Sequence, residues 1–506
     1  MSRGRGVFNI SRRRKFLALF LALLLIPLVY LYSRSNSESP ISLKEYQSQH
    51  LSWSPCYVQF ECTDMSVPID YSDLHAGKFS IRVLRYKARD QKNRLGSLVI
   101  NPGGPGSSGV AFAYNAQTIF SPAILNRYDI VGFDPRGIGE SSAIHCLTDK
   151  ETDANYAADS KPDSAEELKA LLADMQSYVA KCEAFTPNIL HFGSVDAARD
   201  MDLLRIALGE KKLNYLGVSY GTYLGTLYAK FFPKSVGRFV LDGAVSPRAS
   251  TREQDISQAV GFDYALRAFV ADCYRAPKCP LQQPIEKGIS EIRDIFDRAA
   301  KEPLIGTQDR PVTESMVVLG VASALYNSAT GWPELRIALR EARAGNGATF
   351  LKLDDEYTLR NADGTYEENE TDAAFVIDCL DSQKYLTTEQ IQSGAGEFAR
   401  RAPIFGPYLA YGGLGCQFFM GNKVVVKPIS KIASVPIVIV GTTGDPATPY
   451  VWAQDLQKTL LGSHLITLIG DGHTGYGRGT ACVDKAVDKY LLTGVLPRLG
   501  LTCTAI

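Results

Sequence analysis

The sequence predicts an α/β fold in which a mostly parallel central sheet is interrupted by a mainly helical insertion. Short runs rich in β-branched residues alternate with helical patterns, and this alternation is typical of a parallel sheet with helices on both faces. The predicted strands are 81–86, 97–101, 129–134, 215–218, 238–242, 436–441 and 465–470. Apolar residues recur every three or four positions in 195–208, which predicts a helix there.

The strand and helix pattern predicts four parts along the 506-residue chain. Residues 1–45 form an N-terminal segment, and 46–243 form the first part of the core. The alternation fades over 244–430, which we interpret as a cap insertion, and strand-like sequence resumes at Val435 in the closing part of the core, 431–506. An apolar content of 45% with 21% charged residues is sufficient to bury a large core.

The N-terminal segment has the pattern of an export signal. Six basic residues and no acid precede an uncharged apolar run at 16–32, which is followed by a Ser-rich linker. We expect a retained membrane anchor with the body facing outward, and a cleaved signal of a secreted protein stays the alternative. The rest of the chain has 48 basic and 54 acidic residues and no basic stripe. We therefore expect no nucleic-acid partner.

The cysteines indicate an oxidising compartment. All ten lie in the body of the chain, and none occurs in the first 55 residues. Spacing alone leaves the connectivity open, but pairing of neighbours closes short loops. The expected bridges are Cys56 with Cys62, Cys146 with Cys182, Cys273 with Cys279, Cys379 with Cys416, and Cys482 with Cys503.

One motif predicts a nucleophile. Gly217-Val218-Ser219-Tyr220-Gly221 follows a predicted strand and precedes a helix-like stretch. A G-x-S-x-G sequence at such a junction is the pattern of a nucleophile elbow, a sharp turn that lifts a serine hydroxyl above the sheet. Glycines on either side let neighbouring backbone pass without a clash. We predict that Ser219 is the catalytic nucleophile.

A serine hydroxyl needs an adjacent base, which is nearly always histidine. Acid and histidine follow the serine in the chain order of this fold class, so His464 and His473 are the candidates among the six histidines. His464 begins a strand-like run, where its side chain is expected to pack. His473 lies in the glycine-rich loop 470–475 at the carboxyl end of that run, and it is the predicted base.

Asp445 is the predicted acid that accepts the second imidazole N–H. It follows the strand-like run 436–441, and Gly444 and Pro446 are expected to fix a turn around it. Asp242, which ends an earlier strand, stays the alternative because some relatives of this fold carry the acid one strand earlier. Asp471 is too close to His473 in a glycine turn to serve.

The loop 101–109, NPGGPGSSG, predicts a backbone that approaches another group closely. It lacks both the G-K-[ST] of a P-loop and the G-x-G-x-x-G of a dinucleotide site. An oxyanion hole fits better, because it needs one N–H after the nucleophile and one from such an earlier loop. The predicted donors are the N–H groups of Tyr220 and Gly104.

Five ordered motifs carry a family resemblance: NPGGPGSSG, GFDPRGIGES, GVSYG, GTTGDPATP and GDGHTGYG. Together they resemble the secreted tripeptidyl aminopeptidases of actinobacteria, a group similar to the proline iminopeptidases, from about residue 45 to the C terminus. The resemblance implies an α/β-hydrolase fold with a helical cap, and cleavage of short peptides from a free N terminus.

The resemblance also has a departure and an open point. Iminopeptidases begin the oxyanion loop with His-Gly-Gly-Pro-Gly, whereas this loop begins with Pro102, so strict proline specificity is not implied. In those relatives acidic side chains of the cap hold the substrate amine. Glu253 and Asp255 are candidates for that role here, and the sequence does not single them out from the other cap acids.

The leading hypothesis is therefore an exported serine hydrolase, an aminopeptidase that releases tripeptides from peptide substrates with a free N terminus. An esterase or lipase that acts on acyl esters is the alternative, because the same triad serves either leaving group. A non-catalytic cell-surface binding protein is the third hypothesis. No metal or organic cofactor is expected, since the triad needs none and no ligand spacing occurs.

Overall fold

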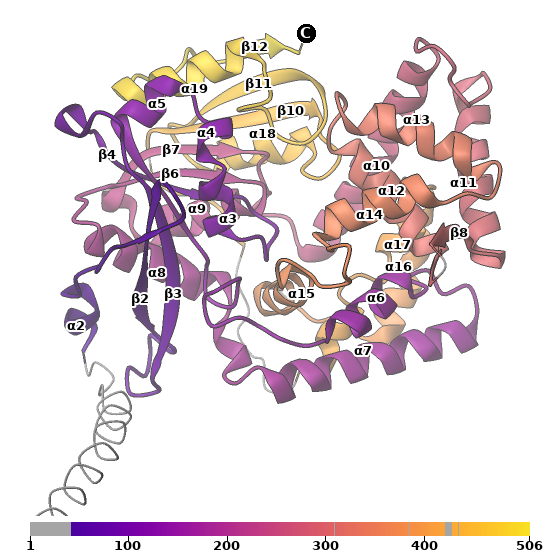
Figure 1. Ribbon diagram of the computed structural model, residues 1–506, viewed down its shortest axis with the longest axis horizontal. Coiled ribbons are helices and arrows are strands. Elements are labelled where there is room, and N and C mark those ends of the chain that lie inside the picture. The colour runs from indigo at the N-terminus through magenta and orange to yellow at the C-terminus, as the bar shows by residue number, and fades with distance from the viewer. Residues whose placement is uncertain (1–41, 308, 383, 420–427, 434, 506) are drawn as a thin grey trace, which may run out of the picture.

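A sheet of ten strands organises the chain in the computed structural model, which describes residues 42–307, 309–382, 384–419, 428–433 and 435–505 (Figure 1). The strands are β1 (Ser54–Cys56), β2 (Phe60–Pro68), β3 (Lys78–Tyr86), β4 (Gly96–Asn101), β5 (Tyr128–Phe133), β6 (Leu213–Val218), β7 (Val236–Asp242), β10 (Ile437–Gly444), β11 (His464–Asp471) and β12 (Leu501–Thr504). Their order is β1-β2-β3-β5-β4-β6-β7-β10-β11-β12.

The sheet is parallel from β5 to β12 and antiparallel among β1, β2, β3 and β5. All seven strands predicted from the sequence are present. The sequence did not single out β1, β2 and β12, which lie at or next to the two edges of the sheet. Because β4, β6, β7, β10 and β11 are parallel neighbours, their carboxyl ends meet at one edge, where ligands of such sheets bind.

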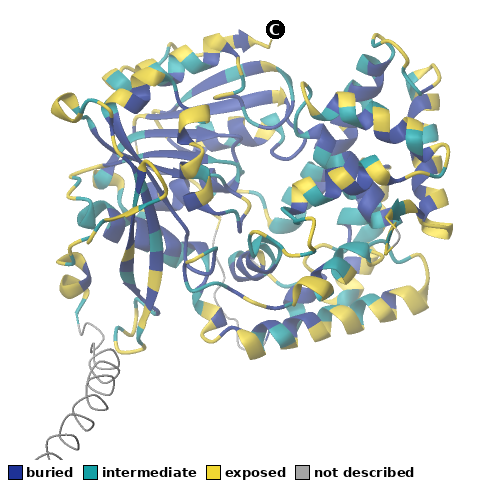
Figure 2. Cartoon of the chain, in the orientation of Figure 1, coloured by how far each residue is buried: buried dark blue, intermediate teal, exposed yellow. Residues whose placement is uncertain are grey.

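Helices cover both faces of the sheet. On one face lie α3 (Gly109–Tyr114), α5 (Pro122–Arg127) and α19 (Ala481–Thr493), and on the other lie α8 (Ser194–Ala207), α9 (Tyr220–Phe231) and α18 (Tyr450–Thr459). Neighbouring residues of β4 alternate between the two cores: Val99 packs with α8 and α9, and Leu98 and Ile100 pack with α5 and α19. The sheet strands are accordingly buried along most of their length (Figure 2).

The insertion between β7 and β10 is helical and has a core of its own, which includes Phe269, Phe296, Leu339 and Phe350. Its helices are α10 (Thr251–Cys273), α11 (Ile285–Lys301), α12 (Glu314–Leu325), α13 (Gly331–Ala342), α14 (Ala348–Thr358), α15 (Glu370–Asp381), α16 (Thr388–Arg401) and α17 (Gly406–Leu409), with a hairpin of β8 (Leu304–Thr307) and β9 (Arg310–Val312). In Figure 1, α10–α14 lie to one side of the sheet.

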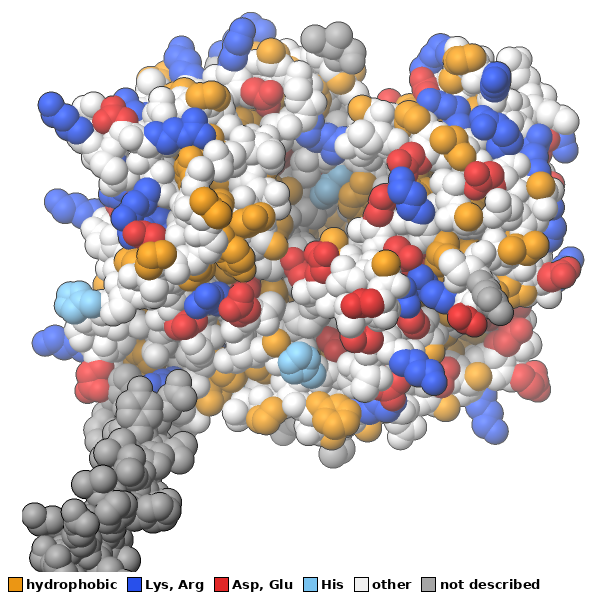
Figure 3. All heavy atoms as spheres, in the orientation of Figure 1, with side chains coloured by type: hydrophobic (Ala, Val, Ile, Leu, Met, Phe, Trp, Pro, Cys, Tyr) orange, Lys and Arg blue, Asp and Glu red, His pale blue; other side chains and the backbone are white. Residues whose placement is uncertain are grey.

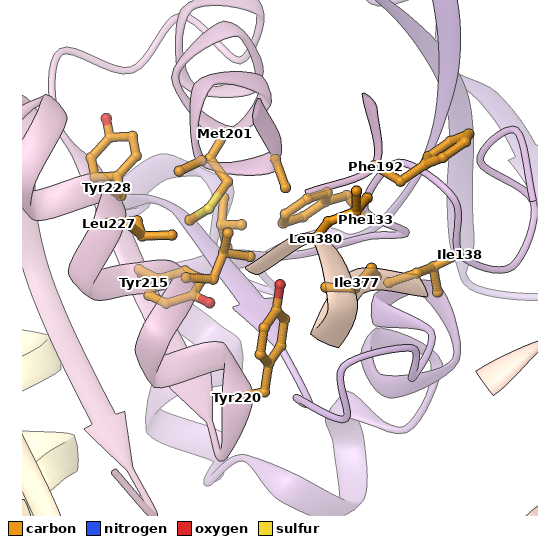
Figure 4. Close-up of a cluster of buried hydrophobic side chains, with 14 of the residues drawn as sticks. Phe133, Ile138, Phe192, Met201, Tyr215, Tyr220, Leu227, Tyr228, Ile377 and Leu380 are labelled. Carbon is orange, nitrogen blue, oxygen red and sulfur yellow. The ribbon is translucent and has the colours of Figure 1, made fainter. Parts of the chain in front are cut away.

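Two helical segments connect the insertion with the sheet. Before the insertion in sequence, α6 (Asp149–Ala157) contacts α12, and the 21-residue α7 (Ala165–Phe185) contacts the segment 414–418 that follows α17. Conversely, α15 of the insertion packs Ile377 and Leu380 into the core beneath the sheet (Figure 4). The remaining α-helices of the described residues are the short α2 (Leu43–Gln47) and α4 (Ala116–Ile119).

Five disulfides are present, and they join the neighbours in sequence: Cys56–Cys62, Cys146–Cys182, Cys273–Cys279, Cys379–Cys416 and Cys482–Cys503. The predicted pairing is therefore confirmed. Among the described residues no cysteine is left unpaired.

The GFDPRGIGES motif contains a buried ion pair. Arg136 is fully buried, and its Nε and Nη2 atoms each lie 2.7 Å from a carboxylate oxygen of Asp200 on α8. The guanidinium also donates to the carbonyls of Pro68, Ile69 and His191. These contacts join β2, the loop after β5 and α8, so this part of the motif holds the fold together.

The apolar run 16–32, expected to act in export, lies outside the described residues. Within the described ranges, no helix is both long enough and apolar enough to cross a bilayer.

Candidate active site

Ser219 occupies the turn between β6 and α9. Its backbone has φ 53° and ψ −123°, a conformation that is unusual for a residue with a side chain and that costs energy. The turn is tight enough to require glycine: a Cβ on Gly217 would lie 2.3 Å from the carbonyl oxygen of Gly221. The N–H of Ser219 donates to the carbonyl of Asp242 at 2.8 Å, which fastens the turn to β7.

His473 and Asp445 lie in contact. Nδ1 of His473 is 2.9 Å from Oδ1 and 2.9 Å from Oδ2 of Asp445, which is 3% exposed. The carboxylate also accepts the N–H groups of Ala447 at 3.0 Å and Thr448 at 2.8 Å, and of Thr474 at 3.1 Å. These donors hold the orientation of a buried negative charge beside the imidazole.

The alternative acid, Asp242, has different partners. Its carboxylate accepts the N–H groups of Gly475 at 3.0 Å and Tyr476 at 2.8 Å, in the turn that follows His473. Burial raises the pKa of Asp242 to about 6, although these hydrogen bonds oppose the shift. The other candidate base, His464, lies at the start of β11, with Nδ1 2.6 Å from the carbonyl oxygen of Pro497.

The glycine-rich loop after β4 packs directly on the nucleophile turn. A Cβ on Gly103 would lie 2.6 Å from the carbonyl oxygen of Val218 and 2.9 Å from Cβ of Ser219, so glycine is needed there. The N–H of Gly103 donates to Oδ1 of Asn101 at 3.1 Å. In the described part of the chain the N–H of Gly104 has no acceptor, and Tyr220 is the first residue of α9, where N–H groups have no partner within the helix.

Residues of the nucleophile turn, the histidine loop and the glycine-rich loop line one cavity of about 410 Å³. Ser219, Gly104 and His473 line it together with Tyr326 and Tyr357 of the insertion. The N–H of His473 donates to the carbonyl oxygen of Tyr326 at 2.8 Å, and the two rings meet edge to face at 5.3 Å. The face drawn in Figure 3 is hollowed between the sheet part and the helical part of the molecule.

Two carboxylates of α15 also line this cavity. Glu370 accepts the hydroxyl of Ser107 at 2.6 Å, and burial raises its pKa. The carboxylate of Asp378 has no hydrogen-bond partner in the described ranges, and this side chain faces the cavity. Although its side chain is exposed to this cavity, desolvation by the surrounding protein, followed by the charges of Asp381 and Asp255, raises the pKa of Asp378 to about 8.

The two cap acids named from the sequence lie elsewhere. Glu253 is exposed and pairs with Arg401 at 3.4 Å. Asp255 and Arg252 line a separate cavity of about 260 Å³, and burial raises the pKa of Asp255 to about 7. Asp378 was missed because one acid in an amphipathic helix gives no local signal of what it faces.

The chain matches two family models. Residues 96–283 match a model described as the alpha/beta hydrolase fold, and residues 402–503 match one described as TAP-like protein.

Several curated proteins are similar over most of their length. The chain is 34% identical to serine protease Hip1 of Mycobacterium tuberculosis over 482 residues, which cover 90% of this chain and 91% of that protein. It is 35% identical to carboxylesterase B of the same organism over 456 residues, 87% of this chain and 86% of that one. It is 29% identical to tripeptidyl aminopeptidase of Streptomyces lividans over 472 residues, 90% of this chain and 86% of that one.

Proposed function

The chain belongs to the α/β-hydrolase family with the TAP-like proteins and is a serine hydrolase, and from that premise we propose that it is an aminopeptidase releasing short peptides, tripeptides, from free N termini. One observation carries the proposal. A single cavity contains Ser219 and His473 together with Asp378, a carboxylate that has no partner in the described part of the chain. A cationic substrate group would complement that carboxylate.

In the proposed mechanism Ser219, His473 and Asp445 act as a triad. Nε2 of His473 takes the proton of the Ser219 hydroxyl while Oγ attacks the scissile carbonyl carbon. His473 then donates this proton to the departing amine as the C–N bond breaks, which leaves an acyl-enzyme on Ser219. A water molecule, deprotonated by His473, then attacks the ester carbonyl, and His473 returns this proton to Oγ of Ser219 as the acyl–oxygen bond breaks and the peptide leaves as a carboxylic acid. Asp445 holds the imidazole tautomer and stabilises the imidazolium, and its 2.9 Å contact with Nδ1 supports this role.

The oxyanion of both tetrahedral intermediates would be held by the N–H groups of Gly104 and Tyr220. Two observations support this proposal. Gly103 packs against Ser219, so the loop lies beside the nucleophile. The N–H of Gly103 already donates to Asn101, so the N–H of Gly104 is the next one along the loop that is left for the oxyanion. Each donor of this kind contributes about 3 kcal/mol to transition-state stabilisation.

The free amine of the substrate would be recognised by Asp378, with Glu370 as the second carboxylate of the cavity. An N-terminal ammonium group has an ordinary pKa of about 8, so it brings a positive charge to a carboxylate that is otherwise costly to ionise. A cavity of about 410 Å³ accommodates a short peptide segment. The name of the Streptomyces relative supports tripeptides as the product.

We also propose that the N-terminal segment exports the enzyme and stays as an anchor, with the body outside the cell. The five disulfides support an oxidising compartment. Protease treatment of intact cells that removes the body tests the outward orientation, and a body that stays protected would contradict it.

The experiment that tests the activity compares one peptide anilide with a free and with an acetylated N terminus, with products identified by mass spectrometry. Release of the tripeptide from the free form alone is expected, and the Ser219→Ala variant is expected to release none. Equal cleavage of the two forms would contradict an aminopeptidase.

An esterase is the second candidate, because a similarly close relative is named carboxylesterase B. An acyl chain has no positive charge, so an esterase gains nothing from Asp378 in the cavity. A kcat/KM for p-nitrophenyl acyl esters far above that for every free-amine peptide anilide would favour the esterase.

A further inference from the structure

Helix α15 of the insertion is bound at its N-terminal end to the glycine-rich loop after β4. Glu370, its first residue, accepts the hydroxyl of Ser107 at 2.6 Å, and Glu368 just before the helix accepts the N–H of Ser108 at 2.8 Å. The contact is close, because a Cβ on Gly106 would lie 2.5 Å from the carbonyl oxygen of Glu370. This end of α15 therefore fixes the loop that contains Gly104.

The C-terminal end of the same helix is bound to the nucleophile turn. Asp381, the last residue of α15, accepts the N–H of Ser194 at 3.0 Å and also the Ser194 hydroxyl. The Ser194 hydroxyl in turn bonds with the hydroxyl of Tyr220. Since the proton of Ser194 goes to the carboxylate, Tyr220 is the donor to Ser194. Figure 4 shows the ring of Tyr220 extending from its helix toward Leu380 and Ile377 of α15.

This network is enclosed by protein. Burial raises the pKa of Tyr220 well above its ordinary value, so the phenol keeps the proton that it donates. Burial raises the pKa of Asp381 to about 6, and its bonds with Ser194 oppose that shift. Ser194 is the first residue of α8, so the carboxylate also meets the positive end of that helix. Polar groups that are buried and fully paired allow few alternative arrangements.

We propose that α15 is a rigid spacer that sets the distance between the two oxyanion donors. Ser194 and Asp381 are positioning residues in this arrangement, and they act through the Tyr220 side chain. The Gly104 N–H lies in the loop bound at one end of the helix, and the Tyr220 N–H lies in the turn bound at the other. Twelve residues at about 1.5 Å each make α15 roughly 18 Å long, and hydrogen bonds within it make that length rigid. This inference depends on the proposed function, because it assigns the oxyanion hole to that reaction.

The test uses Tyr220→Phe, which removes one oxygen atom and leaves the ring in the core. Tyr223→Phe is the matched control: Tyr223 is one turn along α9, is largely buried and contacts the Tyr220 ring at 6.2 Å. Steady-state kcat and KM are measured on a tripeptide anilide and on p-nitrophenyl acetate. The inhibition constant of a tripeptide trifluoromethyl ketone is measured too, because this compound forms a tetrahedral adduct with an oxyanion.

A displaced donor acts in the transition state, so Tyr220→Phe is expected to lower kcat about tenfold on both substrates with KM within about twofold. The ketone should bind weaker by the same factor, and Tyr223→Phe should match the wild type. Asp381→Asn should give a similar loss, and Asp381→Asn combined with Tyr220→Phe should lose no more than the larger single change, because both act through one path.

Two outcomes would overturn the proposal: a Tyr220→Phe variant with the kcat and ketone affinity of Tyr223→Phe, or one with a raised KM and an unchanged kcat. A failure of the proposed function is distinguishable from both, because the wild type would then hydrolyse the ester but no peptide, and the effect of Tyr220→Phe on ester kcat would still decide the role of α15.

Discussion

Asp445 lies 2.9 Å from Nδ1 of His473 through both of its carboxylate oxygens, and it accepts three backbone N–H groups besides. Asp242, on the neighbouring strand, instead accepts two N–H groups from the turn that follows His473. The two buried acids therefore have different partners: Asp445 contacts the imidazole, and Asp242 binds the turn that follows His473.

Asp445→Asn is expected to lower kcat on peptide and ester substrates by about 10⁴-fold, because an amide favours the wrong imidazole tautomer. Asp242→Asn keeps an oxygen acceptor for the turn and is expected to change kcat less than tenfold, with a lower melting temperature. Kinetics and thermal unfolding of both variants measure this. If the larger loss of kcat belonged to Asp242→Asn, the assignment of the acid would be wrong.

Asp378→Asn is expected to raise KM for free-amine peptides about tenfold and to leave KM for p-nitrophenyl acetate unchanged, because only the peptide has a cationic group. Asp354→Asn is the matched control, since burial raises the pKa of that carboxylate on α14 to about 7 and it does not line the cavity. A KM for peptides that rises equally in both variants would contradict the amine site.

The same variant has an effect on stability that depends on pH. The pKa of Asp378 is about 8 in the folded protein and about 4 in an unfolded chain, so between these values the folded state holds a proton that the unfolded state has lost. The free energy of unfolding therefore decreases as the pH rises from about 4 to about 8. Asp378→Asn removes this decrease, and its gain in melting temperature over the wild type should be larger at pH 8 than at pH 5.

Breaking the buried Arg136–Asp200 pair is expected to cost about 3–5 kcal/mol, because Asp200→Asn leaves an arginine charge buried without its partner. Urea unfolding measures this cost. Glu334→Gln, which breaks the surface pair with Lys352, is the control and should cost under about 1 kcal/mol. Comparable losses in the two variants would contradict a structural role for the buried pair.

The Cys379–Cys416 disulfide joins the end of α15 to the segment 414–418 and closes a loop of 37 residues. Replacing both cysteines with serine is expected to lower the free energy of unfolding by about 4 kcal/mol, against about 2 kcal/mol for Cys273–Cys279, whose separation is 6 residues. Calorimetry at one pH compares the two. A larger loss from the shorter loop would show that chain entropy does not govern these bridges.

Seven strands and the five disulfides could be predicted from the sequence because their signals are local. The elbow around Ser219 was predictable for the same reason: its tight turn needs glycines at fixed offsets, and these are visible in the sequence. His473 could be reached by elimination, since few histidines follow the serine in the chain.

The choice between Asp445 and Asp242 needed the tertiary structure, because both end strands of one parallel sheet and their environments differ only through the turn after His473. Likewise, no local pattern separates Asp378 from Asp255. The sequence by itself determined the fold class, a mostly parallel sheet with helices, and predicted Ser219 as the nucleophile, because both depend on local turns and residue type. Only the packing of α15 beneath the sheet decided which carboxylates meet the cavity and which one binds Ser194, because the Ser107–Glu370 and Ser194–Asp381 contacts join residues 263 and 187 positions apart.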